Sequence, residues 1–281
     1  MSLFVASLNS GSNGNCYYVG NAKEGVLVDA GISCRETERR LKYLGLSIKM
    51  IKAIFITHEH ADHINGLAKL IKKHFLPVYI TTATHHNLRA RGRDFRGIPF
   101  EAYVPITIGN LRVEPIPKFH DAADPYSFII SDGGINVGVF TDTGRPCENL
   151  QRYFAICHAA FLESNYDDDM LERGPYPVHL KNRIRGGFGH LSNRQALQVY
   201  LTHRSPSLTH LILSHLSAHN NKPELVAELF APVRGQTEIV VAGRKNETEL
   251  YEITGAPIAV PGFSAMNTKS RPAQLSLFEN A

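Results

Sequence analysis

A cluster of metal-binding side chains follows one apolar segment, and this feature constrains the fold of the chain most strongly. Residues 53–57 are small or branched and mostly apolar, His58, His60, Asp62 and His63 follow them, and an amphipathic segment comes next. This order predicts a buried strand, a loop and a helix. A lone histidine at a strand end is usually an ordinary core or surface residue. Four polar groups crowded at a partly buried position need a partner that offsets their lost hydration, and imidazole with carboxylate suits zinc, iron or manganese.

Composition places the chain among ordinary globular proteins. It has 281 residues, 43% of them hydrophobic and 20% charged, which is enough to bury a sizeable core. The net charge of +4 permits a polyanionic partner without requiring one. We expect a cytoplasmic protein, because the N-terminus does not resemble a signal peptide, no stretch is long and apolar enough to cross a membrane, and the cysteines show no disulfide or thiolate-zinc spacing. These cysteines are Cys16, Cys34, Cys147 and Cys157.

The first third of the chain predicts a β-meander that leads into the histidine cluster. Strands are expected at 3–8, 16–19 and 25–28. The last of these ends at Asp29, which we expect to support the metal ligands rather than to bind metal itself. The Ser/Gly/Asn-rich loop at 9–15 is either a phosphate-binding loop or a plain hairpin connection.

Local signals mark further elements. Ser33 with Glu36 resembles a capping box that starts a helix running to about Leu44. The segment 126–140, with a turn at 132–134, predicts a hairpin. Strand-like segments also follow at 155–162 and 208–213, and helices are expected around 178–185 and 223–230.

Basic residues gather at 89–96, with Phe95 among them. This run is either a solvated face or a contact for a phosphate backbone.

One arrangement occurs five times: an apolar strand delivers His, Asp or Glu into the loop at its end. If the strands share a direction, these loops gather at one edge of the sheets and form a single cleft. They hold more ligands than one tetrahedral metal needs, so the sequence favours a site for two metals. The loops carry the cluster at 58–63, His120, Asp142, Glu163 and His215.

These motifs resemble the metallo-β-lactamase superfamily, whose H-x-H-x-D-H motif is matched at 58–63 and whose later histidine and aspartate motifs follow in order. Within it the chain is similar to YycJ/WalJ-type hydrolases, which are related to the tRNase Z branch. The closer resemblance rests on G-N-C, D-A-G, T-D-T-G, E-S-N, G-H-L-S-N and S-H-L-S at 14–16, 29–31, 141–144, 163–165, 189–193 and 214–217. The resemblance covers most of residues 1–245 and implies an α+β fold, the four-layer αβ/βα sandwich with two mixed sheets flanked by helices.

The resemblance also implies a set of ligands and a proton donor. One metal would take His58, His60 and His120, the other Asp62, His63 and His215, and Asp142 would bridge them. Two cations roughly 3.5–4 Å apart can hold a bridging hydroxide that attacks a phosphodiester. By resemblance, His190 would be the general acid and Glu163 would orient it. The metals are expected to be zinc or manganese, with iron also possible.

The C-terminal residues differ in character from the rest. We expect a hydrolase domain at 1–258 and a polar tail at 259–281. Residues 274–278, Gln-Leu-Ser-Leu-Phe, either dock on the chain's own domain or bind a partner. They resemble the peptide that binds the bacterial sliding clamp, and a flexible tether would raise its effective concentration at DNA.

Together these features predict a dinuclear metal-dependent phosphodiesterase. By resemblance it would be an exonuclease that digests double-stranded DNA from 5′ to 3′, acts in mismatch repair and is recruited to the sliding clamp. One alternative is a hydrolase of the same fold that processes RNA or cleaves a small phosphodiester or ester. Another is a clamp- or DNA-binding adaptor whose metal site is structural.

Overall fold

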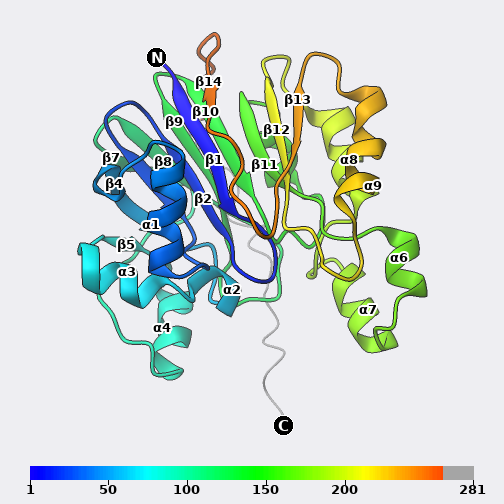
Figure 1. The fold of residues 1–281 in the computed structure, drawn as a ribbon, viewed down its shortest axis with the longest axis horizontal. Helices are drawn as coiled ribbons and strands as arrows, with labels where there is room; N and C mark the ends of the chain where they lie inside the picture. Colours follow the sequence, from blue (N-terminus) through cyan, green and yellow to red (C-terminus); the bar gives the residue numbers. More distant parts are fainter. Residues whose placement is uncertain (262–281) are drawn as a thin grey trace.

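The computed structural model describes residues 1–261, which form two seven-stranded sheets packed face to face and flanked by helices (Figure 1). The first sheet has the order β14-β1-β2-β3-β4-β5-β6 and the second β13-β12-β11-β10-β9-β8-β7. In the first sheet the strands are β1 (Leu3–Asn9), β2 (Cys16–Gly20), β3 (Gly25–Val28), β4 (Ile51–Phe55), β5 (Val78–Tyr79), β6 (Gly97–Ile98) and β14 (Tyr251–Ile253). In the second they are β7 (Ile106–Ile108), β8 (Leu111–Pro117), β9 (Tyr126–Asp132), β10 (Ile135–Phe140), β11 (Ala159–Glu163), β12 (His210–Ser214) and β13 (Glu238–Val241).

Both sheets are mixed, as the family resemblance implies. In the first sheet β1, β2 and β3 pair antiparallel, whereas β3, β4, β5 and β6 pair parallel. In the second sheet β7 to β10 pair antiparallel and β10 to β13 pair parallel. Parallel neighbours place their carboxyl ends at the same edge. In the second sheet, β10, β11 and β12 therefore deliver their loops to one edge, and β8, which runs in the same direction as β10, delivers the loop of His120 there. In the first sheet, β4 delivers the cluster at 58–63.

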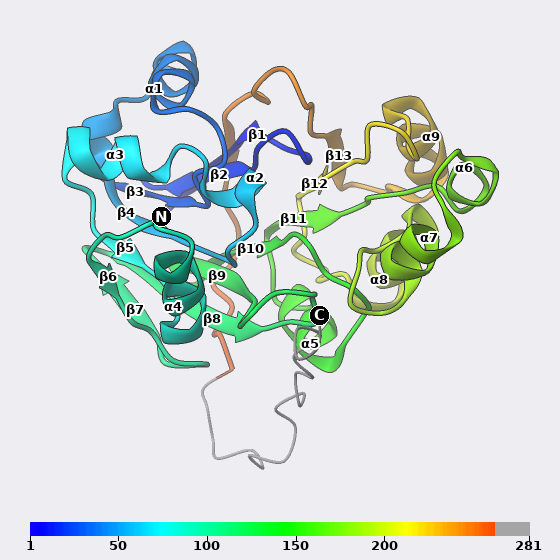
Figure 2. The same cartoon turned by 90° about the horizontal axis from the view of Figure 1, so that it is seen from below.

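Helices cover the outer face of each sheet. Beside the first sheet lie α1 and α3, and beside the second lie α5, α8 and α9 (Figure 2). The α-helices are α1 (Cys34–Tyr43), α2 (Ala61–Ile64), α3 (Leu67–His74), α4 (Thr82–Ala90), α5 (Glu148–Phe154), α6 (Asp168–Arg173), α7 (Val178–Arg185), α8 (Asn193–His203) and α9 (Pro223–Phe230). Single 3₁₀ turns occur at Ile48–Met50 and Ala231–Val233. Among the residues that the structure describes, no helix is both long and apolar enough to cross a membrane.

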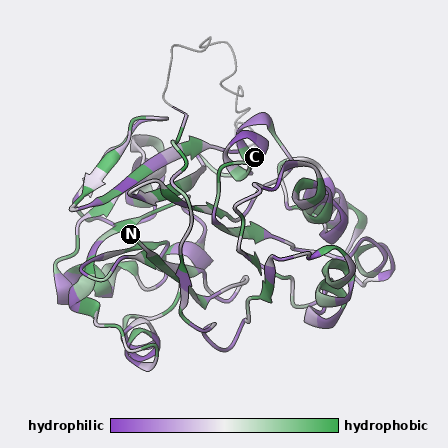
Figure 3. Ribbon diagram, turned by 90° about the horizontal axis from the view of Figure 1, so that it is seen from above, coloured by the Kyte–Doolittle hydropathy of each residue, from purple (hydrophilic) through white to green (hydrophobic). Residues whose placement is uncertain are grey.

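Three apolar layers hold the sandwich together. The central layer joins the facing sheets and includes Phe55, Phe128 and Phe161, all fully buried. A second layer lies between the second sheet and its helices, and a third between the first sheet and its helices. In Figure 3 the central strands are mostly hydrophobic, whereas the outer helices carry hydrophilic stretches. These layers confirm the predicted four-layer fold.

Most local predictions are correct, and the exceptions have clear causes. Ser33 caps α1 by accepting a hydrogen bond from the Glu36 backbone at 3.2 Å. The Glu36 carboxylate pairs instead with Arg39 and Arg40, so in the described part of the chain only the Ser33 half of the predicted capping box forms. The predicted strand at 155–162 begins only at Ala159, because the preceding residues end α5, a helix that the apolar pattern did not reveal.

Candidate metal centre

The turn after β4 gathers the first donors. His58 lies just beyond the strand, His60 is the N-cap residue of α2, and Asp62 and His63 lie in the helix itself. His58 Nε2 and His60 Nδ1 are 3.0 Å apart. The predicted strand, loop and helix are present. The turn into the short α2 brings the donor side chains of segment 58–63 into one cluster.

His120, from the loop after β8, completes one group of three histidines. Its Nε2 lies 3.3 Å from His60 Nδ1. The donor atoms of His58, His60 and His120 all lie within 4.8 Å of one another. Ring nitrogens that face each other at such distances need a proton or a cation between them. This donor set fits a metal ion.

A second group forms from Asp62, His63 and His215. Asp62 Oδ2 lies 3.5 Å from His63 Nε2 and 3.5 Å from His215 Nε2. His215 Nε2 is buried without a hydrogen-bond partner among the described residues. An unsatisfied buried acceptor or donor is costly, and a bound cation would satisfy it. The second group also fits a metal ion.

Asp142 lies between the two groups. Its carboxylate oxygens are 3.2 Å from His63 Nε2, 3.4 Å from His215 Nδ1 and 3.7 Å from His120 Nε2. The side chain is almost fully buried, at 2% exposure. All seven side chains predicted as ligands thus lie in one cluster, and their binding of metal stays a prediction.

In most of the histidine rings of the two groups, one ring nitrogen contacts a neighbouring polar group. In four of the five histidines of the two groups, Nδ1 is engaged and Nε2 faces the centre. Such contacts fix the tautomer and the orientation of ligating imidazoles. They join His58 to Thr57 Oγ1 at 2.8 Å, His63 to Asp29 Oδ2 at 2.7 Å, His120 to the Gly189 carbonyl at 2.9 Å, and His215 to Glu163 Oε1 at 2.9 Å. The supporting position predicted for Asp29 agrees with this geometry.

His190 and Glu163 lie at the edge of the cluster. His190 Nδ1 is 2.8 Å from Glu163 Oε1, and its side chain is 18% exposed. The other oxygen of this buried carboxylate accepts hydrogen bonds from the backbone of Thr143 at 2.7 Å and of Leu191 at 3.1 Å. Glu163 therefore holds His190 and His215 at once.

Burial and neighbouring charges shift the pKa values of the histidine rings in the cluster. Burial lowers the pKa of His58 and of His120 well below the ordinary value. Burial also opposes protonation of His215, but Asp142 and other carboxylates outweigh it and raise the pKa of His215 to about 10. The same balance holds the pKa of His63 well above its ordinary value. Without metal, His63 and His215 therefore keep protons that a metal must displace.

Two side chains of the site were not predicted from the sequence. Asn15 donates to Asp62 Oδ2 at 3.1 Å and lies 3.1 Å from His63 Nε2. Lys118 is buried and donates to the Thr141 carbonyl at 2.6 Å, which ties the loop of His120 to the loop of Asp142. The G-N-C motif marked Asn15 as a feature of the resemblance, but only the fold brings it to Asp62.

The protonated state of the metal-free centre generates a prediction. Metal binding should release protons, so apparent affinity should increase with pH up to the pKa of His215 near 10. Each released proton contributes up to about ten-fold per pH unit. Calorimetric titration with Zn²⁺ in buffers of different ionisation enthalpy measures both quantities. Affinity that does not change with pH, with no proton release, would contradict it.

Comparison with known proteins identifies the superfamily of the chain and two similar proteins. The family model of the metallo-beta-lactamase superfamily matches residues 10–178. Exodeoxyribonuclease YycJ of Bacillus anthracis is 36% identical over 80% of this chain and 86% of that protein. Exodeoxyribonuclease WalJ of Streptococcus pneumoniae serotype 2 is 30% identical over 78% of this chain and 83% of that protein.

Solved structures agree on the architecture. The metallo-beta-lactamase fold protein YhfI from Bacillus subtilis has a TM-score of 0.69 at 18% identity, over 89% of this chain and 99% of its own. The short form of human tRNase Z has a TM-score of 0.60 at 15% identity, over 89% and 99% of the two chains. At these identities the likeness shows the fold alone. On the strength of the family model and of the YycJ and WalJ relatives, the chain belongs to the metallo-beta-lactamase superfamily and is a metal-dependent hydrolase.

Proposed function

We propose that this protein is a two-metal phosphodiesterase that digests double-stranded DNA from the 5′ end in DNA mismatch repair. The observation that carries the two-metal proposal is the position of Asp142 between two groups of donors. DNA as the substrate is supported by the relatives named exodeoxyribonucleases, which align over most of the chain. The polarity and the repair role rest on the family resemblance alone.

The residues divide into two proposed ligand sets. His58, His60 and His120 would hold one ion, Asp62, His63 and His215 the other, and Asp142 both. When bound, two divalent cations stabilise charge on a phosphoryl group and lower the pKa of a coordinated water. The protein contributes rigid positions for these donors, because Asp29, Thr57 and Glu163 hold the rings in place.

His190 is the proposed proton donor. Burial opposes ionisation of Glu163, but the charge of His190 and their hydrogen bond outweigh it and lower the pKa of this carboxyl. The resulting carboxylate accepts the Nδ1 proton of His190 and orients the ring, and a protonated ring would carry a second proton on Nε2. The Nε2 proton is then available for the departing alkoxide. Partial exposure of the ring keeps it accessible to a substrate.

Basic residues lie on or just after two helices, α4 and α7. Figure 2 looks onto the edge that carries α2, with α4 on one side and α7 on the other. Arg91 and Arg96 follow α4, are exposed, and form no ion pair within residues 1–261. On α7, Arg183 and Arg185 are exposed but pair with Asp121 and Glu172. The exposed Arg91 and Arg96 side chains favour the interpretation of the basic run at 89–96 as a contact for a phosphate backbone.

A substrate panel tests the proposed function. Metal-loaded protein should degrade 5′-labelled duplex DNA faster than duplex RNA or a chromogenic diester, and Asp142→Ala should abolish all turnover. Gel analysis of labelled products measures rate and polarity. Turnover of the small diester without digestion of DNA would favour the alternative small-substrate hydrolase. Preference for RNA would favour the RNA-processing alternative, and absence of turnover on every substrate would favour the adaptor with a structural metal site. Full activity in Asp142→Ala would contradict the mechanism.

The acid role generates a separate prediction for His190. His190→Ala should lower kcat on DNA by about 10²–10⁴-fold. The same variant should cleave a nitrophenyl phosphodiester almost normally, because nitrophenolate leaves without protonation. Steady-state kinetics on both substrates makes the comparison. Equal losses on both would mean that His190 positions the site and does not donate the proton.

Clamp recruitment is a further proposal, based on the sequence match at Gln274–Phe278. These residues lie outside the part of the chain that the structure describes. Deleting residues 273–281 should weaken a pull-down with the sliding clamp and leave hydrolysis of free DNA unchanged. Substituting Leu277 and Phe278 by Ala should have the same effect as the deletion. Undiminished pull-down by either variant would refute this proposal.

A further inference from the structure

An exposed aromatic ring stands beside the metal centre. Phe188 is 40% exposed and lies two residues before His190. Its ring makes an edge contact with Phe119, whose centroid is 5.8 Å away. The guanidinium carbon of Arg145 lies 3.8 Å from the Phe119 ring centroid and 5.9 Å from that of Phe188. We call Phe119, Phe188 and Arg145 the aromatic platform.

The platform is built on the same three loops that carry His120, Asp142 and His190. The backbone of Gly144 donates to the Phe119 carbonyl at 2.7 Å, and that of Asp121 donates to the Phe188 carbonyl at 2.9 Å. A Cβ added to Gly144 would lie 2.5 Å from the Phe188 Cα, so the loops approach as closely as glycine allows. The loop backbones that carry the two rings are therefore tied together before any substrate binds.

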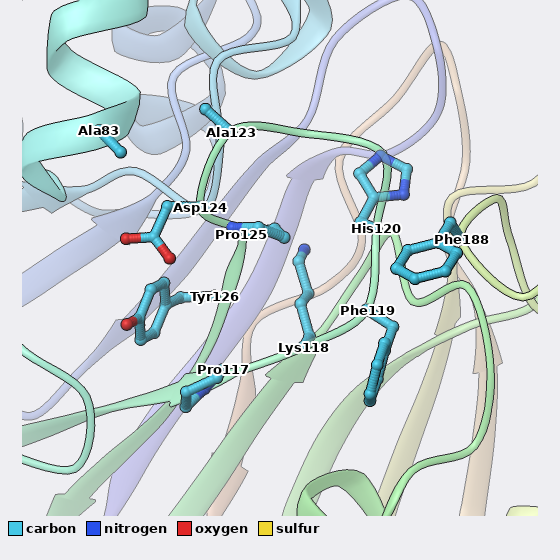
Figure 4. A pocket seen from close by; sticks show the side chains of 10 residues that line it. All are labelled: Ala83, Pro117, Lys118, Phe119, His120, Ala123, Asp124, Pro125, Tyr126 and Phe188. Atoms are coloured by element: carbon cyan, nitrogen blue, oxygen red, sulfur yellow. The ribbon is translucent and has the colours of Figure 1, made fainter. Parts of the chain in front are cut away.

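A cavity opens beside the platform, along the segment 117–126 that carries His120. Its volume is about 290 Å³, near the lower end of ligand pockets, and its lining includes Phe119, Phe188 and His120 (Figure 4). A wider cavity of about 830 Å³ continues toward α4 and shares Asp124 and Tyr126 with the first. The space beside the proposed ligand His120 is thus flanked by aromatic faces.

Charge at the platform suits a nucleotide. Arg145 is exposed and forms no ion pair with any residue in the described range 1–261. Its guanidinium covers the Phe119 ring, while Phe188 keeps much of its surface open to solvent. Exposed aromatic faces bind nucleobases by stacking, and arginine adds attraction for π systems and phosphate.

We propose that the aromatic platform binds the nucleobase adjacent to the scissile phosphate. This inference rests on the proposed function and extends it. A base stacked on Phe188 has left the stack of its duplex, so the platform takes an unpaired end nucleotide. Stacking tolerates every base, which suits an enzyme that removes successive nucleotides without reading their sequence.

A binding experiment separates stacking from packing. Calorimetry compares a 2′-deoxynucleoside 5′-monophosphate with 2-deoxyribose 5-phosphate, which lacks the base. Wild-type protein should bind the nucleotide with an affinity roughly ten-fold or more above that for the sugar phosphate. Phe188→Leu keeps an apolar side chain but loses the π face, so it should lose this preference, whereas Phe188→Trp should retain it. Tyr43→Ala, which alters an exposed aromatic on α1, is the matched control and should behave like wild type.

Either of two results would overturn the inference: no preference for the nucleotide in wild type, or an unchanged preference in Phe188→Leu. The kinetic counterpart uses duplex DNA with an abasic terminal residue. Phe188→Leu should raise KM about ten-fold on ordinary DNA and leave KM on the abasic substrate unchanged. Because the calorimetric comparison requires no cleavage, a nucleotide preference together with inert DNA would refute the proposed function and leave the platform intact.

Discussion

The buried carboxylate of Asp142 is the group on which the rest of the site depends. A carboxylate at 2% exposure is unfavourable unless positive charge or hydrogen bonds replace water. Here His63 and His215 approach it at 3.2 and 3.4 Å, and Thr141 Oγ1 donates to it at 2.7 Å. Burial opposes ionisation, but His215 and His63 outweigh it and hold the pKa of Asp142 well below its ordinary value. The site thus places a carboxylate charge at the point where the two proposed groups of metal ligands meet.

The backbone around this carboxylate adopts an uncommon conformation. Asp29, Asp142 and His215 have φ values of 63°, 48° and 57°, in the left-handed region that residues other than glycine seldom occupy. Each lies within two residues of the end of a strand, β3, β10 or β12. Such conformations cost on the order of 1–3 kcal/mol each and persist where the surrounding packing enforces them. The sandwich supplies that packing, which turns the three side chains toward the candidate metal centre.

The sequence could predict the local part of this arrangement. Alternation of apolar strands with loops that carry His, Asp or Glu indicated which residues meet at one edge, and family resemblance divided them into two ligand sets. Contacts of side chains that were not among these predicted site residues could not be foreseen from the sequence. The hydrogen bond between Asn15 and Asp62 joins residues 47 positions apart. In the aromatic platform, the rings of Phe119 and Phe188 meet from separate loops. The helix α5 was missed because its apolar residues Leu150, Tyr153 and Phe154 form too short a pattern to identify.

The number of bound ions tests the shared role of Asp142 most directly. Elemental analysis of fully active, purified protein, normalised to the chain concentration, gives that number. We predict two divalent ions per chain, with Asp142→Ala binding fewer, since Asp142 lies between the two groups. A single ion per chain in the fully active protein, unaffected by Asp142→Ala, would contradict the shared centre.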